Sequence, residues 1–191
     1  RMQALERFGE VVESRHQYAR DWKERTGGKV LGYLCTYVPE ELIYAAGILP
    51  VRILGSHEPQ DVTEPHIFGL YCPFCRDCLA QGLKGRYDYL DGITIAHSCM
   101  HIRQTFDSWQ RHVPVDYSYY IFMPAHVQSR HAYACFTGEL VEFKKLREVT
   151  GEEAFNARVE YRGPSNPSTG SLPRIQFDLT YYEELVLPPE D

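Results

Sequence analysis

The spacing of hydrophobic residues changes along the chain, and each change marks a different predicted element. Over residues 2–25, apolar side chains recur at steps of three and four, as at Leu5, Phe8 and Val12, which predicts an amphipathic helix. A pair of glycines at 27–28 ends the pattern, as glycines often do at the carboxyl end of a helix.

Compact apolar runs then alternate with helix-like stretches up to about residue 150. The predicted strands cover residues 29–34, 49–54, 89–96 and 115–123. The predicted helices cover residues 39–47, a stretch from 72 to 82 or 85, residues 100–111 and residues 132–149. Strands that alternate with helices at this spacing favour βαβ units, so the predicted fold class is α/β, with a parallel sheet flanked by helices.

Two stretches break this alternation. Residues 55–65 are polar, contain two prolines and are predicted to form a loop. After residue 150 the periodicity fades: residues 162–173 are rich in Pro, Gly, Ser and Asn, and residues 175–187 have room for one strand. We therefore predict an α/β domain over residues 1–150, and an irregular linker or partial second domain over residues 151–191.

Composition and charge narrow the classes of function. The net charge of −6 argues against a surface that binds nucleic acid through phosphate contacts. No apolar run approaches the roughly 20 residues that a membrane-spanning helix needs. The stretch 1–23 is charged throughout, unlike a secretory signal, and six cysteines in such a chain are typical of cytosolic thiols or metal ligands. We thus predict a cytoplasmic protein without nucleic-acid or membrane partners.

Five of the six cysteines fall between residues 35 and 99. Three form the motif Cys72-Pro-Phe-Cys75-Arg-Asp-Cys78, and the other two, Cys35 and Cys99, each follow a predicted strand. In parallel α/β sheets the ligand site lies beyond the carboxyl ends of the strands. Iron–sulfur clusters take thiolate ligands, and C-x-x-C-x-x-C is a spacing that wraps them, so the pattern predicts a cluster at this edge.

Other interpretations of the central motif remain open. Cysteines three residues apart drift by about 60° per step around a helix, so one or two of Cys72, Cys75 and Cys78 are equally compatible with ordinary buried packing. A complete small-ferredoxin motif would need a fourth cysteine, but position 82 is Gly.

Two histidines flank Cys99. His97 and His101 are candidate catalytic residues, since either can donate a proton to a substrate or hydrogen-bond a cluster sulfur. The group of His97, Cys99 and His101 is also the only candidate for part of a structural zinc site, and that alternative stays open. Cys135 has no other thiol near it in sequence and is predicted to be structural.

Two segments resemble a known family. The segment Gly32-Tyr-Leu-Cys-Thr-Tyr-Val-Pro-Glu-Glu-Leu-Ile-Tyr-Ala-Ala-Gly-Ile-Leu-Pro-Val-Arg52 closely resembles the opening motif of the 2-hydroxyacyl-CoA dehydratase and benzoyl-CoA reductase family. The Cys-Pro-Phe-Cys-Arg-Asp-Cys motif, followed by Leu90-Asp-Gly-Ile and the terminal Cys99, is similar to it as well. Residues 56–66 and 88–103 most resemble the smaller benzoyl-CoA reductase subunits.

The resemblance implies a flavodoxin-like α/β fold and a [4Fe-4S] cluster held largely by cysteines, with a larger double-cubane cluster as an alternative. Cys35, Cys72 and Cys99 match family cysteines and are the expected metal ligands. Cys75 and Cys78 are further candidates for cofactor binding. Family subunits are longer and carry a second α/β domain, which residues 151–191 do not resemble.

The function implied by the resemblance is that of an iron–sulfur subunit of an ATP-dependent, ferredoxin-linked benzoyl-CoA reductase, which reduces the aromatic ring. The alternatives are a 2-hydroxyacyl-CoA dehydratase subunit, a lyase that works through a ketyl radical, and a non-catalytic electron-transfer iron–sulfur protein. The implied partners are a homologous sister subunit, an ATP-hydrolysing activator, ferredoxin and an aromatic acyl-CoA. Neither G-x-x-x-x-G-K-[ST] nor G-x-G-x-x-G occurs, so another chain would bind ATP. We expect the aromatic run Tyr117–Phe122 at a contact with another chain.

Overall fold

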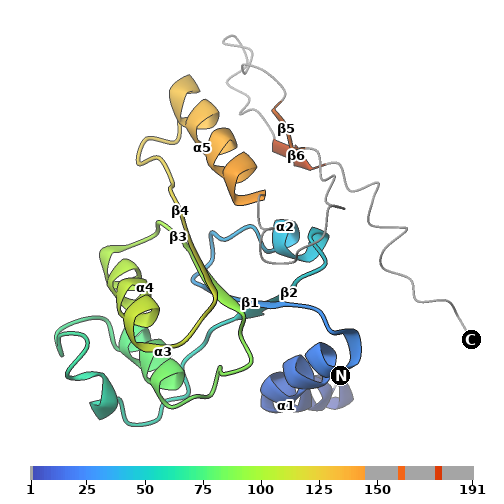
Figure 1. The fold of residues 1–191 in the computed structure, drawn as a ribbon, viewed down its shortest axis with the longest axis vertical. Helices are drawn as coiled ribbons and strands as arrows, with labels where there is room; N and C mark the ends of the chain where they lie inside the picture. Colours follow the sequence, from blue (N-terminus) through green and yellow to red (C-terminus); the bar gives the residue numbers. More distant parts are fainter. Residues whose placement is uncertain (1, 145–158, 162–174, 178–191) are drawn as a thin grey trace, which may run out of the picture.

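A four-stranded sheet lies at the centre of the chain, with helices on both of its faces (Figure 1). The computed structural model describes the backbone of residues 2–144, 159–161 and 175–177, and the side chains of residues 5–129 and 131–144. The strands are β1 (Val30–Leu34), β2 (Leu49–Arg52), β3 (Gly92–Ala96) and β4 (Tyr117–Ile121). They are all parallel and lie in the order β2-β1-β3-β4, which is the order of flavodoxin-like sheets. The predicted parallel α/β fold is confirmed.

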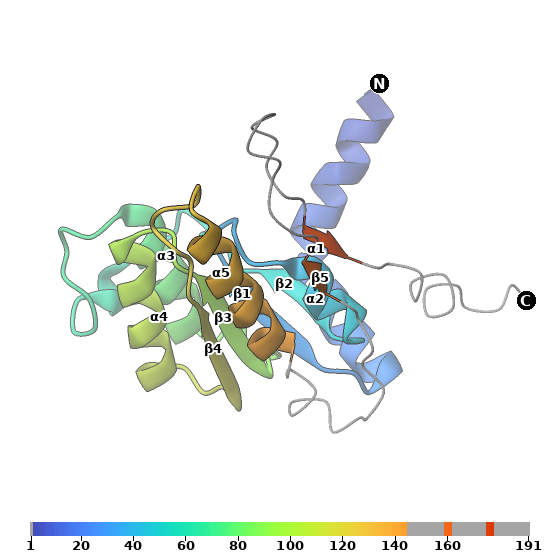
Figure 2. The same ribbon diagram turned by 90° about the horizontal axis from the view of Figure 1, so that it is seen from above.

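Helices connect the strands and cover the sheet. They are α1 (Met2–Thr26), α2 (Glu40–Ala45), α3 (Pro73–Leu83), α4 (Met100–His112) and α5 (Arg130–Phe143), with one turn of 3-10 helix, η1 (Asp61–Thr63), inside the predicted loop. Two short strands, β5 (Val159–Tyr161) and β6 (Ile175–Phe177), pair in antiparallel fashion. Figure 2 shows the layers from above, with α1 projecting from the body of the domain.

The elements lie where they were predicted, but several of their ends differ by a few residues. Gly27 ends α1 with a φ of 66°, as expected for a glycine after a helix. β3 starts at Gly92, later than predicted. α5 starts at Arg130, earlier than predicted, because the Ser129 hydroxyl caps it by accepting from the amide of Ala132 at 3.0 Å. The predicted continuation to residue 149 and the predicted linker at 162–173 lie outside the described residues, and β5 was not predicted.

The central strands are buried on both faces, which explains their continuous apolar runs. Val30 and Leu34 of β1 pack with residues of α1, α3 and α4, and Leu31 and Tyr33 pack with residues of α2 and α5. A side chain at Gly32 would collide with Leu90, since a Cβ there would lie 2.6 Å from its Cδ1 atom. The close packing fixes the position of β1 within the sheet, and with it the position of Cys35, which follows the strand.

The chain reverses its direction across the sheet between β1 and β3. From β1 it passes through α2 to β2 on one side, and from β2 it passes through α3 to β3 on the other side of β1. Such a reversal leaves a crevice beyond the carboxyl ends of the two strands, which is where open α/β sheets bind ligands. Cys35 follows β1 and Cys99 follows β3, so both lie beyond the carboxyl ends of adjacent strands, as predicted from the sequence.

A search of the described residues found no helix with the length and hydropathy needed to cross a lipid bilayer.

Candidate metal centre

Cys35 stands directly after β1 in a backbone conformation that few residues adopt. Its φ angle is 69°, in the left-handed region where side chains other than that of glycine are strained. The residue is half-buried, and its Sγ lies 3.7 Å from Oγ1 of Thr36. A strained cysteine at the ligand-binding edge of a sheet indicates a use for its thiol.

The surroundings of Cys35 favour the thiolate. Burial alone would raise the pKa of this thiol, but interactions with the hydroxyls of Ser98 and Thr36 outweigh burial, and the charge of Arg52 acts in the same direction. The pKa of Cys35 therefore lies below its usual value. Arg52 ends β2 and is the register partner of Tyr33, which places its charge at the same edge.

Cys72 is the residue before α3, and Pro73 occupies the first position of the helix, where a missing amide hydrogen costs nothing. The amide of Cys72 donates to Nδ1 of His101 at 2.8 Å. The sulfur makes no capping hydrogen bond of ordinary geometry, yet it is close enough to the amides of Cys75 and Phe74 for them to lower its pKa against the effect of burial. Low thiol pKa values are typical of helix N-termini.

Cys75 and Cys78 lie deeper, with 2% and 0% of their surfaces exposed. Burial, followed by the neighbouring Cys72 and Cys99 thiols, raises the pKa of Cys75 to about 12. Burial also raises the pKa of Cys78, whose thiol donates to the carbonyl of Ile53 at 3.9 Å. Cys78 is therefore a protonated thiol inside the hydrophobic core, whereas Cys75 lies one turn nearer to the edge.

Cys99 is exposed and caps α4. Its Sγ accepts from the amide of Ile102 at 3.4 Å, the role that an oxygen usually fills at a helix N-terminus. The hydroxyl of Thr105 lies 3.3 Å from the carbonyl of Cys75 and 3.1 Å from that of His101, so it ties α3 to α4. The two helices thus present Cys72, Cys75 and Cys99 from adjacent N-terminal turns.

The link between β3 and α4 holds two buried polar atoms that lack hydrogen-bond partners in the described part of the chain. They are Nδ1 of His97 and Oγ of Ser98. The Ser98 hydroxyl is near enough to Cys35 to affect its pKa without forming a hydrogen bond of ordinary geometry. The His97 ring lies 5.7 Å from that of Tyr120 and 6.2 Å from that of Phe122. Buried polar atoms normally have partners, so these two leave room for an acceptor or donor from outside.

The hydrogen bond from the amide of Cys72 selects one tautomer of a neutral His101 ring. Because the amide of Cys72 can only donate, Nδ1 of His101 must accept, and a neutral ring then carries its proton on Nε2. The ring also packs edge-on against Tyr71, with centroids 4.9 Å apart. His101 therefore presents an N–H group, which can donate a hydrogen bond to a sulfur atom or a substrate.

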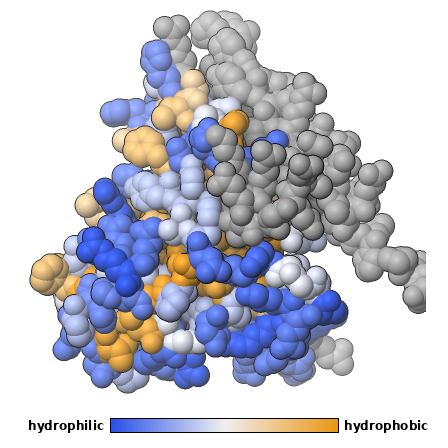
Figure 3. All heavy atoms as spheres, in the orientation of Figure 1, coloured by the Kyte–Doolittle hydropathy of each residue, from blue (hydrophilic) through white to orange (hydrophobic). Residues whose placement is uncertain are grey.

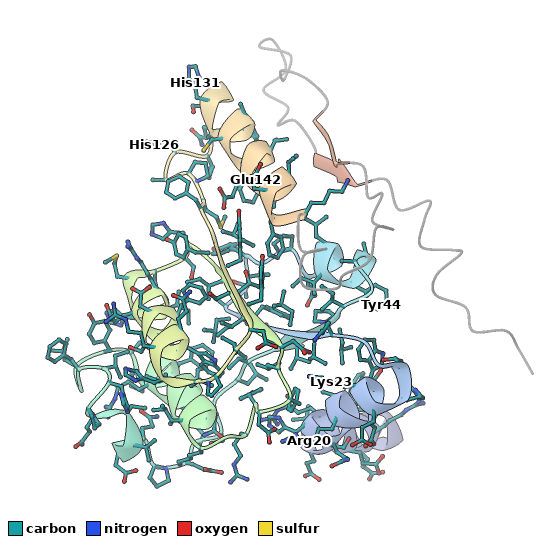
Figure 4. All side chains as sticks on the ribbon, viewed as in Figure 1. Arg20, Lys23, Tyr44, His126, His131 and Glu142 are labelled. Atoms are coloured by element: carbon teal, nitrogen blue, oxygen red, sulfur yellow. The ribbon has the colours of Figure 1, made fainter. Side chains whose placement is uncertain are left out.

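The structure brings all but one of the predicted site residues to one edge; the exception is Cys78. The residues at the carboxyl edge of β1 and β3 are Cys35, Cys72, Cys75, His97, Cys99 and His101. Cys78 points into the core, and Cys135 is exposed on α5, which packs on the opposite face of the sheet from α3 and α4. His126 precedes α5, and His131 lies in its first turn (Figure 4).

The donors at this edge are thiols, which are the ligands that iron–sulfur clusters take. Within the described ranges, no three His, Cys, Asp or Glu side chains stand close enough together to bind one metal ion. An iron–sulfur cluster is larger than one ion, so its cysteine ligands stand farther apart and come from separate turns. Half-exposed and exposed thiols from three elements, with His97 and Ser98 beside them as unsatisfied polar groups, match the ligands and sulfur-bonding groups of such a cluster.

One residue that supports the site was not recognised in the sequence. Asp77, inside the cysteine motif, is 5% exposed and accepts from the amides of Ser56 and His57 at 2.9 and 2.8 Å. These bonds anchor the loop after β2 to α3, and His57 in that loop has a φ of 61°. The sequence did offer a sign of this role, because Asp77 stands between the candidate cysteines Cys75 and Cys78. A carboxylate buried there needs several hydrogen-bond donors.

Exposed hydrophobic side chains stand close to the cysteines in the chain or directly follow β4. They include Phe68 (74% exposed), Leu70 (83%), Phe74 (41%), Met100 (63%) and Phe122 (46%). Figure 3 shows hydrophobic side chains at the surface over the region of α3 and α4. Apolar residues gathered beside a polar site are typical of surfaces that another chain or a ligand covers.

A family model described as 2-hydroxyglutaryl-CoA dehydratase, D-component, matches residues 35–161 of the chain, so its match begins at the first of the site cysteines. This confirms the family that the sequence motifs suggested.

Individual relatives are similar over 92 to 157 residues. The C subunit of benzoyl-CoA reductase from Thauera aromatica is 32% identical over 71% of this chain and 36% of its own length. The beta subunit of (R)-phenyllactyl-CoA dehydratase from Clostridium sporogenes is 34% identical over 48% of this chain and 25% of its own length. The beta subunit of (R)-2-hydroxyglutaryl-CoA dehydratase from Acidaminococcus fermentans is 31% identical over 80% of this chain and 41% of its own length. The chain thus spans between a quarter and two fifths of the length of these relatives.

Proposed function

Because the chain belongs to the 2-hydroxyglutaryl-CoA dehydratase D-component family, we propose that it is an iron–sulfur subunit of an acyl-CoA-transforming complex, and specifically of a benzoyl-CoA reductase. The observation that carries this proposal is the gathering of thiols from β1, α3 and α4 at the topological switch point of the sheet. The reductase assignment is supported by the 32% identity with the C subunit of benzoyl-CoA reductase over most of the described domain.

Cys35, Cys72 and Cys99 are the proposed ligands of a [4Fe-4S] cluster. All three are at least partly exposed, and each is the first residue after a strand or the first residue before a helix. Cys78 is excluded from the ligand set because its protonated thiol is bonded to a carbonyl inside the core. Further ligands would come from parts of a full-length subunit beyond the described residues.

When bound, the cluster supplies electrons one at a time at low potential, which the reduction of an aromatic ring requires. The residues of this chain orient it and control protons. His101 keeps its proton on Nε2 because the amide of Cys72 occupies Nδ1. A neutral imidazole with its proton on Nε2 can donate a hydrogen bond to a cluster sulfur or to a bound substrate. His97, two residues before Cys99, has a buried Nδ1 that lacks a hydrogen-bond partner among the described residues.

We assign the exposed hydrophobic side chains near the cysteines to contacts with both the substrate and a partner subunit. Phe68, Phe74 and Phe122 offer aromatic surface against which a planar acyl group can pack. The remaining exposed hydrophobic side chains would be covered by a homologous sister subunit, because an exposed cluster would react with water and oxygen. An ATP-hydrolysing activator, with ferredoxin as electron source, would deliver the electrons.

A second candidate function is the dehydration of a 2-hydroxyacyl-CoA. Two dehydratase beta subunits, with 34% and 31% identity, and the matching family model favour it. Both reactions need low-potential electrons at a cysteine-bound cluster, so the geometry of the thiols serves either one.

The test is a substrate comparison under strict anoxia. The chain, co-expressed with its sister subunit and activator, is reduced and supplied with ATP and either benzoyl-CoA or a 2-hydroxyacyl-CoA. The proposal predicts a dearomatised acyl-CoA from the first substrate and no enoyl-CoA from the second. Enoyl-CoA formation alone would establish the dehydratase, and turnover of neither substrate by an iron-loaded complex would favour an electron carrier.

A further inference from the structure

Cys72 and Cys75 lie at the start of α3, and the proposed ligand set uses only the first of them. Cys72 is the N-cap, Cys75 is the third helical residue, and the amide of Arg76 closes the turn by donating to the carbonyl of Cys72 at 3.1 Å. Residues three apart on a closed turn lie on the same face of a helix. The two thiols are near enough to each other for each to affect the pKa of the other.

The two thiols differ in access. Cys72 is half-exposed, whereas Cys75 has 2% of its surface exposed and lies between α3 and α4. A reagent in solution can therefore reach Cys72 but not Cys75. An exposed cysteine at a helix N-terminus, followed after two residues by a buried one, is the arrangement of dithiol–disulfide exchange sites.

We propose that Cys72 and Cys75 form a reversible disulfide in the cluster-free chain, by exchange with a low-molecular-weight disulfide such as glutathione disulfide. The thiolate of Cys72 attacks one sulfur of that molecule, which breaks its S–S bond, forms a mixed disulfide and releases one thiol. Cys75 then loses its proton to water and attacks Sγ of Cys72, which releases the second thiol. The two cysteines are oxidised by two electrons, and the small disulfide is reduced to two thiols.

The backbone favours this pair over the competing one. Cys99 also interacts with Cys75, but it belongs to α4 and its Sγ accepts from the amide of Ile102. A bond between Cys75 and Cys99 would break that cap and pull together two helices that Thr105 already holds at a set distance. Cys72 and Cys75 share one turn, so they need only side-chain rotation.

The disulfide would control when the site can be filled. With Cys72 oxidised, one of the three proposed ligands is withheld, and iron cannot enter until a dithiol reduces the pair. This consequence rests on the proposed function, whereas the disulfide itself does not.

The experiment uses the full chain, stripped of metal with a chelator under anoxia and equilibrated in buffers of glutathione and glutathione disulfide. Free thiols are then alkylated and located by peptide mass spectrometry. The peptide that holds both Cys72 and Cys75 is expected to lose two hydrogen atoms as the buffer becomes more oxidising, and to regain them with dithiothreitol. Cys135→Ser is the matched control, because its thiol is exposed on a different helix and should change nothing at the pair.

Substitutions of Cys75 test the second step of the exchange. In Cys75→Ser the exchange stops at the first step, so glutathione should remain bound to Cys72. Cys75→Ala provides the same readout if the serine variant fails to fold. Alkylation of both Cys72 and Cys75 at every buffer ratio, or a Cys75–Cys99 bond in the wild type, would overturn the proposal. Iron uptake is measured in parallel: loss of uptake in the oxidised chain and recovery on reduction support the gate, whereas no uptake in either state counts against the proposed function alone.

Discussion

The two edges of the parallel sheet use polar groups in opposite ways. At the amino edge, Asp91 is 6% exposed and fully engaged: Lys23, Lys29 and the amide of Val30 all donate to it at distances of 2.8 to 3.0 Å. At the carboxyl edge the thiols are partly exposed, and buried polar atoms of His97 and Ser98 have no partner within the described residues. Figure 4 shows Lys23 and Arg20 on α1, where it packs against the domain.

The amino edge of the sheet stabilises the domain, whereas the carboxyl edge carries the proposed function. Asp91 joins α1, the start of β1 and the start of β3, so its bonds hold three elements together. The carboxyl edge carries strain at Cys35 and unmet hydrogen bonds, which are typical costs of a functional site. Changes at the amino edge should therefore affect stability, and changes at the carboxyl edge should affect metal binding.

The largest expected effect is on iron. Cys35→Ala and Cys72→Ala should each abolish stable iron binding, since each removes a ligand, while the free energy of unfolding changes by less than about 1 kcal/mol because both residues are partly exposed. Metal analysis and urea unfolding of the same preparations check both parts. Cys135→Ala is the control and should keep its iron. Retention of iron by both ligand variants would remove the distinction between the edges.

The second effect is on stability at the amino edge. Asp91→Ala leaves the amide of Val30 without an acceptor and two lysines without a counter-ion, so the free energy of unfolding should fall by about 3 kcal/mol. Asp91→Asn keeps an acceptor for the amide and should lose less. Urea titration measures the loss. The folded fraction of either variant should bind iron as the wild type does, and a selective loss of iron would show that the edges are coupled.

The third effect is a pH dependence that belongs to the amino edge. Burial would raise the pKa of Asp91, but the amide of Val30 and the two lysines outweigh it and hold the pKa below its usual 3.8. A carboxylate with a depressed pKa stabilises the fold above that usual value, and the contribution is lost as the pH falls from about 4 toward the lower folded pKa. Wild-type protein should thus lose more stability between pH 6 and pH 3 than Asp91→Asn, as measured by urea unfolding at each pH. Parallel losses in the two proteins would contradict the assignment.

The smallest effect concerns His101. In His101→Ala the amide of Cys72 loses its acceptor, which should cost about 1 kcal/mol and loosen the start of α3. The reaction of Cys72 with iodoacetamide should accelerate as a result. His101→Gln, which retains a side-chain acceptor, should restore the slower rate. An unchanged rate in His101→Ala would mean that the imidazole does not position Cys72.

The sequence predicted the sheet and the edge but not the arrangement of side chains within the edge. Apolar runs bounded by glycines identified the strands, because central strands of a parallel sheet are buried on both faces. The start of β3 was predicted too early because Asp91 does not interrupt the hydrophobic pattern of the sequence. In the structure Asp91 lies before the strand, where its carboxylate accepts hydrogen bonds. The deep position of Cys78 and the support from Asp77 depend on the rotation of α3 against β2, which spacing alone does not define.

The most direct measurement of the central claim is the iron and acid-labile sulfide content of the chain purified without oxygen together with its sister subunit. Convergent thiols of Cys35, Cys72 and Cys99 predict iron and sulfide in equal amounts, with both lost together in Cys99→Ala. Stoichiometric zinc without sulfide would contradict the account.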